Sequence, residues 1–294
     1  MRAPTAAALS AAGLDPSEVA RIVHTTLDED LGTPWRDVTA EATIPAGQRD
    51  TAELVARADG VVAGLPVAAA VFEAVSADVT VRLAAADGDA VARGDVLAVV
   101  AGPTRALLSA ERSALNLLCR MSGVATHTRR WVDALAGTKA QVLDTRKTTP
   151  GLRALDKYAV RAGGGTNKRL GLYDVAMVKD NHKLAAGGVG EAYRRVRAHA
   201  PDVAVQVEVT TVAEAREAVG AGADFLLADN MTPAQLVDVV AAVGDRAEVE
   251  ATGGLVLDNA RAYAATGVDF LSVGALTHSS PILDIALDLR VGEG

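Results

Sequence analysis

The chain has 294 residues, a formal net charge of −8 and a composition that is 50% hydrophobic but only 3% aromatic, so it can bury one barrel-sized core and a smaller second domain. An acidic chain is a poor general nucleic-acid surface and its apolar runs are too short to span a membrane, so neither kind of partner is expected. The single cysteine, Cys119, cannot form an intrachain disulfide, which fits a cytoplasmic protein.

An amphipathic helix is predicted near the start of the chain. Asp15 is a preferred N-cap residue, Pro16 suits the first helical position, and Glu18 follows the cap by three residues. Apolar residues then recur on one side until Gly32, which predicts a helix over residues 16–31. Because the Ala-rich stretch before this cap lacks a Leu-type apolar centre, it is expected to be mature protein and not a signal peptide.

Short β-runs broken by glycine follow this helix. Asp37-Val38-Thr39 is predicted to open an extended region, and between Ala52 and Gly102 the runs are TAELVARADG, VVAGLPV, VTVRLAAADGDAV and VLAVVAG. Residues 87–97 resemble the turn and strand of a lipoyl or biotinyl domain, but no lysine stands at a hairpin tip to accept the cofactor. The region therefore predicts a small sandwich-like module that shares the architecture of such domains and not their cofactor chemistry.

Two helices are predicted after Pro103, over residues 104–121 and 123–135. The first is apolar enough to be largely buried, yet Glu111 and Arg112 interrupt it, and buried polar groups are costly unless they are paired. Either these two side chains form a structural salt bridge, or the helix reaches a site or a subunit contact. Both interpretations stay open on the residues alone.

From residue 140 onward, strands and helices alternate. Helix-like segments such as 212–219 and 233–243 separate apolar strand cores, which are centred near Val142, Val175, Val205, Phe225, Val249 and Phe270. Strands about 20 to 30 residues apart with helices between them form parallel βαβ units. Six in succession favour a barrel, and an open doubly wound sheet is the alternative.

Charged or small residues follow each of these strands. The carboxyl ends of parallel strands meet at one end of a barrel, the usual place of its active site. Any one such residue can be a helix cap, as Asp229 can before Thr232 and Pro233, but a coincidence at six strands favours a common site. The residues concerned are Arg146, Lys147, Lys179, Glu208, Asp229, Asn230, Glu250, Thr252 and Gly274.

A cationic stretch lies within this acidic chain. Residues 144–183 hold nine Lys or Arg against four Asp, and such a patch in a cleft attracts a small polyanion. Glycines 163–165 either stop a helix after residues 159–162 or form a turn whose backbone amides approach an anion. The nearby cations, including Lys168 and Arg169, favour the turn.

The residue types at the barrel mouth indicate its ligands. Cations suit carboxylates and phosphates, and five are expected here: Arg146, Lys147, Lys168, Arg169 and Lys179. Acidic residues without clustered His or Cys suit Mg²⁺ held by oxygen, and the candidates are Glu208, Asp229 and Glu250. Because the loops after the last two strands commonly bind phosphate in barrels, the site predicts a phosphorylated sugar, a metal ion and a carboxylated molecule.

The stretch DTRKTTPGLRALDKYAVRAGGGTNKRLGL, preceded by AERSALNLL and followed by VKDNH, VEV, ADN and EATGGL, resembles the quinolinate phosphoribosyltransferase family. EDLG at 29–32, DVT at 37–39 and VGALTHS near the C-terminus extend the resemblance over nearly the whole chain. The order DTRKT, KYAV, GGG, KDNH is highly specific.

This resemblance implies an α/β fold and a reaction. The fold comprises an N-terminal mixed α/β sandwich domain over residues 1–121, joined by residues 279–294, and an incomplete TIM-like αβ barrel over residues 122–278, in a homodimer. The reaction transfers phosphoribosyl from phosphoribosyl pyrophosphate to quinolinate with decarboxylation. It yields nicotinate mononucleotide, pyrophosphate and CO₂ in de novo NAD synthesis.

The resemblance also implies roles for the matching residues. The pyridine dicarboxylate would be held by Arg146 and Arg169, together with Arg112 from the partner subunit, and Lys168 would be a further substrate-binding residue. Phosphate or pyrophosphate would contact Lys147 and Lys179. The ribose hydroxyls and Mg²⁺ would be bound by Glu208 and Asp229, which with the two lysines form the catalytic set. The 5′-phosphate would lie on Thr252, Gly253, Gly254 and Gly274.

One position departs from the family pattern. Where the family commonly shows Asn-His-Arg after the glycines, this chain has Asn167-Lys168-Arg169. Lysine keeps the positive charge but removes a group that titrates near neutrality. The change is therefore conservative if the residue binds carboxylate, and disruptive if it must transfer a proton.

Two other activities stay open. A related phosphoribosyltransferase that acts on nicotinate or another carboxylated acceptor would use the same site, although three arginines argue for a dicarboxylate. A barrel aldolase with Lys179 as a Schiff-base nucleophile needs that lysine in an apolar pocket. It leaves the paired acids and the phosphate loops unexplained.

Overall fold

A computed structural model describes residues 1–290 of the chain. They divide into two compact units: one is formed by Met1–His127, Thr149–Gly164 and the described residues from Ser279 onward, the other by Thr128–Thr148 and Gly165–His278. The predicted domain bounds, 1–121 and 122–278, stay a prediction. The segment 279–294, predicted to join the first domain, includes residues 291–294, which lie outside the described residues.

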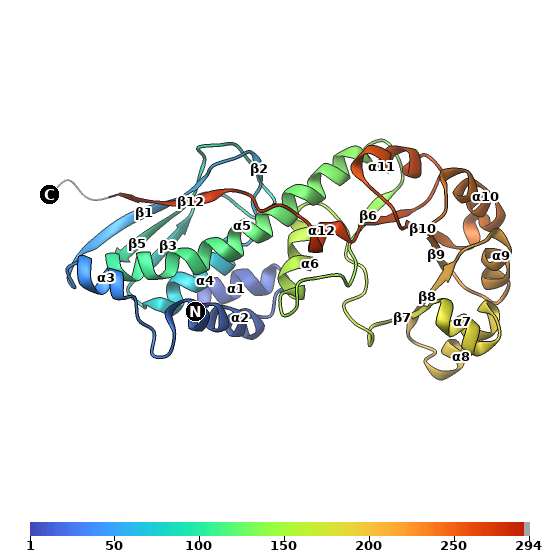
Figure 1. Ribbon diagram of the computed structural model, residues 1–294, viewed down its shortest axis with the longest axis horizontal. Helices are drawn as coiled ribbons and strands as arrows, with labels where there is room; N and C mark the ends of the chain where they lie inside the picture. Colours follow the sequence, from blue (N-terminus) through green and yellow to red (C-terminus); the bar gives the residue numbers. More distant parts are fainter. Residues whose placement is uncertain (291–294) are drawn as a thin grey trace. The chain divides into compact units, whose positions relative to one another are not determined.

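The first unit is built on an antiparallel four-stranded sheet in the order β12-β1-β5-β3 (Figure 1). Its strands are β1 (Arg49–Ala56), β3 (Thr80–Leu83), β5 (Val96–Pro103) and β12 (Ile285–Arg290). The register of β1 with β12 runs from Thr51 opposite Arg290 to Ala56 opposite Ile285. A second, two-stranded sheet pairs β2 (Gly60–Val61) with β4 (Ala90–Val91).

Helices supply the rest of this unit, and their bounds are α1 (Ala3–Ala11), α2 (Pro16–Leu31), α3 (Val38–Thr43), α4 (Leu65–Val75) and α6 (Arg153–Ala162). Helix α4 contributes much of the core, because its residues 67–72 are all buried. The predicted helix over 16–31 is confirmed, and the Asp15 carboxylate caps it by accepting a hydrogen bond from the Ser17 amide at 2.9 Å.

Two local predictions in this unit are wrong. Asp37 does not open an extended region: its carboxylate accepts hydrogen bonds from the amides of Thr39 and Ala40 and caps α3. The run VVAGLPV is a strand only at Val61, since Gly64 adopts a left-handed φ of +102° and α4 starts at Leu65. An N-cap side chain and a left-handed glycine thus start helices where apolar runs indicated strands.

The two helices predicted after Pro103 are one helix, α5 (Thr104–Ala134). Gly123 does not interrupt it. A Cβ at this position would lie 2.1 Å from the carbonyl oxygen of Pro281, so the glycine allows a close backbone approach instead of ending the helix. Burial raises the pKa of Glu111 and the charge of neighbouring Arg112 opposes this rise, so both interpretations of these two side chains stay open.

The second unit is a six-stranded parallel sheet in the order β6-β11-β10-β9-β8-β7. The strands are β6 (Gln141–Leu143), β7 (Val175–Val178), β8 (Ala204–Val209), β9 (Phe225–Asp229), β10 (Glu248–Thr252) and β11 (Phe270–Ser272). All six predicted strand cores are confirmed. Since β6 and β7 are the edges of the sheet, it is an incomplete barrel, and the predicted fold class of a mixed α/β domain plus a parallel αβ barrel is confirmed.

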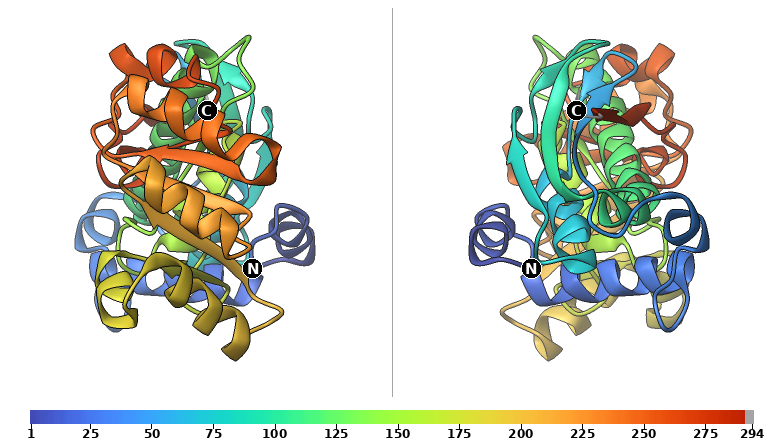
Figure 2. Two further views of the ribbon diagram at one scale, coloured as in Figure 1. Left: turned by 90° about the vertical axis from the view of Figure 1, so that its right-hand side faces the viewer. Right: turned by 90° about the vertical axis from the view of Figure 1, so that its left-hand side faces the viewer.

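Helices connect these strands on the outer side of the sheet, and Figure 2 (left) shows those coloured yellow to orange in front of it. They are α7 (Asp180–Ala186), α8 (Val189–His199), α9 (Val212–Gly220), α10 (Pro233–Val243), α11 (Leu257–Ala264) and α12 (Ala275–His278), with a short 3₁₀ turn at Gly244–Arg246. Across residues 1–290, none of the helices has both the length and the apolar character needed to cross a membrane.

Candidate active site

The carboxyl ends of the parallel strands surround a cavity of about 230 Å³. It is lined by Thr145, Arg146, Lys147, Lys168, Arg169, Met177, Lys179, Glu208, Leu227, Asp229, Thr252 and Ser272. The structure therefore brings together all five cations and two of the three acids predicted for the barrel mouth, Glu208 and Asp229, whereas Glu250 is fully buried and does not line the cavity. Gly253, Gly254 and Gly274 follow directly after β10 and β11, whereas Arg112 lies on α5 in the first unit.

A larger cavity, of about 650 Å³, lies at the amino ends of the same strands. Both of its cations are engaged with the protein: Lys139 pairs with Asp269 at 2.7 Å, and Arg246 donates to backbone carbonyls at the end of α10. The smaller cavity is the better active-site candidate, because barrels carry their chemistry at the carboxyl ends of the strands.

Asp144, at the end of β6, fixes the cationic loop. This fully buried carboxylate accepts 2.7 Å hydrogen bonds from the backbone amide of Lys168 and from the side-chain amide of Asn167. Sequence reasoning assigned no role to Asp144. The available signal was its position: an acidic residue directly after a buried strand has to be paired.

The two arginines of the cavity repel each other. The guanidinium of Arg169 donates to the Val175 carbonyl at 3.2 Å, and burial together with nearby Arg146 lowers its pKa. Two like charges in a partly buried cavity are stabilised when an anion lies between or beside them. The pair therefore indicates a carboxylate or phosphate ligand.

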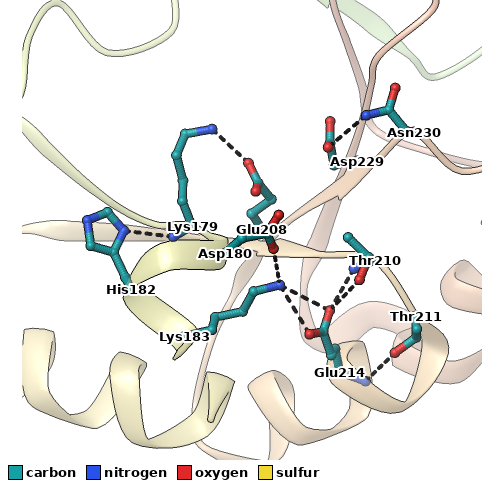
Figure 3. Close-up of polar contacts among 10 residues, drawn as sticks. All are labelled: Lys179, Asp180, His182, Lys183, Glu208, Thr210, Thr211, Glu214, Asp229 and Asn230. Carbon is teal, nitrogen blue, oxygen red and sulfur yellow. Dashed lines mark hydrogen bonds and ion pairs between the residues drawn. The ribbon is translucent and has the colours of Figure 1, made fainter. Parts of the chain in front are cut away.

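The acidic side of the cavity consists of Glu208 and Asp229, which lie near the carboxyl ends of the neighbouring strands β8 and β9 (Figure 3). Glu208 is 6% exposed and accepts a 2.7 Å hydrogen bond from the Lys179 ammonium. Asp229 accepts one from the side-chain amide of Asn230 at 2.8 Å.

Two such carboxylates form a donor set that Mg²⁺ accepts when substrate oxygens and water complete its shell. Within the described chain there is no group of three or more His, Cys, Asp or Glu that could hold a metal ion. An ion at Glu208 and Asp229 would therefore be shared with the substrate.

A second polar network behind Lys179 fixes α7 against the loop after β8 (Figure 3). The buried ammonium of Lys183 pairs with Asp180 at 2.8 Å and with Glu214 at 3.1 Å. Burial alone would raise the pKa of Glu214, but hydrogen bonds from Thr210 and Lys183 outweigh it and the pKa is lowered. The network holds the segment that carries Lys179, and sequence reasoning did not find it.

The loop after β10 is shaped by left-handed glycines. Gly253 has φ +90°, and a Cβ there would lie 2.1 Å from the Asn230 side-chain oxygen. At the end of β11, a Cβ at Gly274 would lie 3.0 Å from the Lys147 side chain. A Cβ at Gly253 would therefore clash with Asn230, whereas at Gly274 the Lys147 side chain would have to shift slightly.

Comparison with known proteins decides the family. Residues 37–122 match the model of the quinolinate phosphoribosyl transferase N-terminal domain, and residues 124–288 match that of its C-terminal domain. The chain belongs to the quinolinate phosphoribosyl transferase family.

Relatives from this family cover nearly the whole chain. The nicotinate-nucleotide pyrophosphorylase [carboxylating] of Mycobacterium leprae is 49% identical over 272 residues, which are 91% of this chain and 95% of that protein. A probable enzyme of the same name from Bacillus subtilis is 44% identical over 264 residues, or 90% of both. The crystal structure of NadC from Streptococcus pyogenes superposes with a TM-score of 0.90 at 38% identity, covering 94% of this chain and 98% of that one.

Human nicotinic acid phosphoribosyltransferase shares the fold alone, with a TM-score of 0.63 and 14% identity over 87% of this chain and 73% of that one. The resemblance to the quinolinate phosphoribosyl transferase family stated from the motifs is confirmed, while the roles of individual site residues stay predictions.

Proposed function

We propose that this chain transfers phosphoribosyl from phosphoribosyl pyrophosphate to quinolinate and removes one carboxylate as CO₂, which yields nicotinate mononucleotide and pyrophosphate for NAD synthesis. One observation supports this most directly: a single cavity of a family member combines two arginines and three lysines with two carboxylates at the carboxyl ends of a parallel sheet. A polyanionic sugar donor and a dianionic acceptor match that arrangement.

The acceptor is held on the side of Arg146 and Arg169. A guanidinium binds a carboxylate through two parallel hydrogen bonds, so two arginines orient a pyridine dicarboxylate in one plane. Arg112 is proposed to enter from a partner subunit. The homodimer and the cytoplasmic location are part of this proposal and rest on the family resemblance and the single cysteine.

The donor is held on the other side. Lys147 and Lys179 neutralise pyrophosphate, Glu208 and Asp229 bind the ribose hydroxyls, and the 5′-phosphate lies on the backbone of Thr252, Gly253, Gly254 and Gly274. Mg²⁺ held by Glu208 and Asp229 would supply further neutralisation of the leaving pyrophosphate.

The residues then stabilise charge as it develops. The bond from the anomeric carbon to pyrophosphate breaks with its electron pair on the leaving oxygen, where Lys147 and Lys179 lie. Positive charge grows on the ribose, which the carboxylates of Glu208 and Asp229 stabilise. The pyridine nitrogen forms the new bond, and its positive ring accepts the electron pair left on the ring carbon when CO₂ departs. A proton from solvent then replaces the lost carboxylate.

A nicotinate-specific transferase is the second candidate, because the same cations would bind an acceptor with a single carboxylate. A Schiff-base aldolase is disfavoured, because Lys179 pairs with Glu208 and its side chain is 49% exposed, unlike a lysine in an apolar pocket.

The test is an assay with phosphoribosyl pyrophosphate, Mg²⁺ and either quinolinate or nicotinate, in which pyrophosphate and CO₂ are both measured. Equal release of the two products from quinolinate alone supports the proposal. Turnover with nicotinate only, or pyrophosphate without CO₂, refutes it. Arg146→Ala should abolish quinolinate binding, whereas Arg194→Ala, on the exposed surface of α8, is the matched control and should bind normally.

A further inference from the structure

Lys168 and Glu250 form a deeply buried ion pair beside the cavity. The ammonium lies 2.6 Å from one Glu250 oxygen, and the two side chains are only 6% and 0% exposed. The lysines of two other ion pairs in this unit are more exposed to solvent: the side chain of Lys179, paired with Glu208, is 49% exposed, and that of Lys139, paired with Asp269, is 57% exposed.

Stability alone does not account for this pair. Burying two charges costs several kcal/mol per ion before their attraction is counted, and well-packed apolar residues often replace such pairs without loss. The second Glu250 oxygen adds to the cost, because it is buried and has no hydrogen-bond partner in residues 1–290. A costly pair beside a binding cavity indicates a role in binding.

The geometry shows what the pair holds in place. Lys168 lines the cavity, and its backbone amide is fixed by the Asp144 carboxylate at 2.7 Å. Glu250 lies two residues before Thr252 on β10, so the side chains of Glu250 and Thr252 point to the same face of the sheet. Glu250 itself is fully buried and does not line the cavity. Lys168 is thus fixed at both its backbone and its ammonium.

The charge of Lys168 depends on this partner. Burial lowers the pKa of the ammonium, Arg169 and Lys179 lower it further, and the Glu250 carboxylate acts in the opposite direction. Other charged groups lining the same cavity are Arg146, Lys147, Glu208 and Asp229. Glu250 is the directly bonded counter-charge that keeps a cation at position 168.

We propose that Glu250 is a positioning residue for the acceptor: it holds Lys168 as a fixed cation on the cavity wall, where Lys168 recognises a carboxylate of the acceptor beside Arg169. This inference rests on the proposed function. It concerns acceptor recognition and not the donor side of the site.

The test compares Glu250→Gln with the wild type in steady-state assays from about pH 6 to pH 9. Glutamine keeps the shape and removes the charge. The KM for quinolinate should rise about tenfold at the alkaline end and less at the acid end, because loss of the Glu250 charge lowers the pKa of Lys168 further, while the KM for phosphoribosyl pyrophosphate changes less than about twofold. Glu250→Asp should restore part of the affinity.

Two further variants separate positioning from structure. Lys168→Met should raise the KM for quinolinate at every pH, and Lys168→Met/Glu250→Gln should match it without further loss, because Glu250 acts only through Lys168. Lys139→Met removes an ion pair at the other end of the strands and should leave both KM values unchanged. Equal effects of Glu250→Gln on both substrates, or a pH-independent KM for quinolinate, overturn the inference.

Failure of the proposed function is seen separately, as absence of quinolinate turnover in the wild type. In that case the pH dependence of the free energy of unfolding tests whether Glu250 maintains the charge of Lys168. With Glu250→Gln the folded-state pKa of Lys168 falls further below its unfolded value, so the unfolded state binds more protons and stability rises with pH up to about pH 10. A rise no steeper than that of the wild type overturns it.

Discussion

Replacing Asp144 with alanine should release the loop that carries Lys168 and Arg169. The carboxylate is fully buried and accepts two 2.7 Å hydrogen bonds, from the Lys168 backbone amide and the Asn167 side chain. A hydrogen bond to a charged group contributes about 1.5–3 kcal/mol. Water that enters the space left by the carboxylate recovers part of this, so a local loss of about 2–3 kcal/mol is expected.

Hydrogen exchange of the Lys168 amide measures this loss directly, because that amide donates to Asp144. A loss of about 2–3 kcal/mol corresponds to exchange about 30- to 150-fold faster, since each 1.4 kcal/mol is a factor of ten. The KM for quinolinate should rise in parallel. Asp144→Asn retains one acceptor oxygen and should show about half the effect in kcal/mol. Unchanged Lys168 exchange in Asp144→Ala would show that the carboxylate does not hold the loop.

Two further predictions concern other parts of the molecule. Gly253→Ala should raise the KM for phosphoribosyl pyrophosphate, because its Cβ would lie 2.1 Å from the Asn230 oxygen. Gly187→Ala is the control, because Gly187 has the same φ of +90° but a Cβ there would meet nothing within 4 Å in the described structure. Tyr158→Phe removes the 2.6 Å hydrogen bond to Asp87, whose pKa burial already raises. Because the pKa of Asp87 is higher in the folded than in the unfolded state, the free energy of unfolding falls as the pH rises above about 4. Without the Tyr158 hydrogen bond, this fall should be larger by about 1–2 kcal/mol.

The Gly253 and Tyr158 variants each have their own control. If Gly187→Ala raises the KM as much as Gly253→Ala, backbone strain and not the contact with Asn230 is responsible. For Tyr158, the comparison is Tyr193→Phe, which removes a hydrogen bond to the uncharged Gly222 carbonyl and should destabilise equally at every pH. Parallel unfolding curves of the Tyr158 variant and the wild type from about pH 4 to pH 7 would contradict the role of Asp87.

The barrel and its mouth could be predicted from the sequence because both depend on short-range patterns. Strand β9 is a continuous apolar run up to Asp229, β8 carries a valine at every second position, and the last residues of each strand necessarily lie at the carboxyl end of the sheet. This is how Lys179, Glu208 and Asp229 were found, and the cavity confirms that they lie together.

What the sequence did not reveal depends on partners distant along the chain. Asp144 contacts residues 23 and 24 positions later, and Glu250 lies 82 positions after Lys168. Helix α4 was missed because its start depends on Gly64 and on the Asp87 carboxylate, which accepts from the Gly64 and Leu65 amides. Long-range pairing of this kind has no periodicity, so single-sequence patterns do not detect it.

The pairing of β12 with β1 constrains how the protein can be made. Arg290 lies 237 positions after Glu53, to which it is bonded, so the ribosome must synthesise almost the whole chain before the first sheet receives this strand. Until then the outer side of β1 presents unpaired backbone groups, and such an edge readily pairs with another chain. When many copies are synthesised close together, the unpaired edge of β1 should therefore favour aggregation. A chaperone that protects the chain during synthesis should bind at this strand.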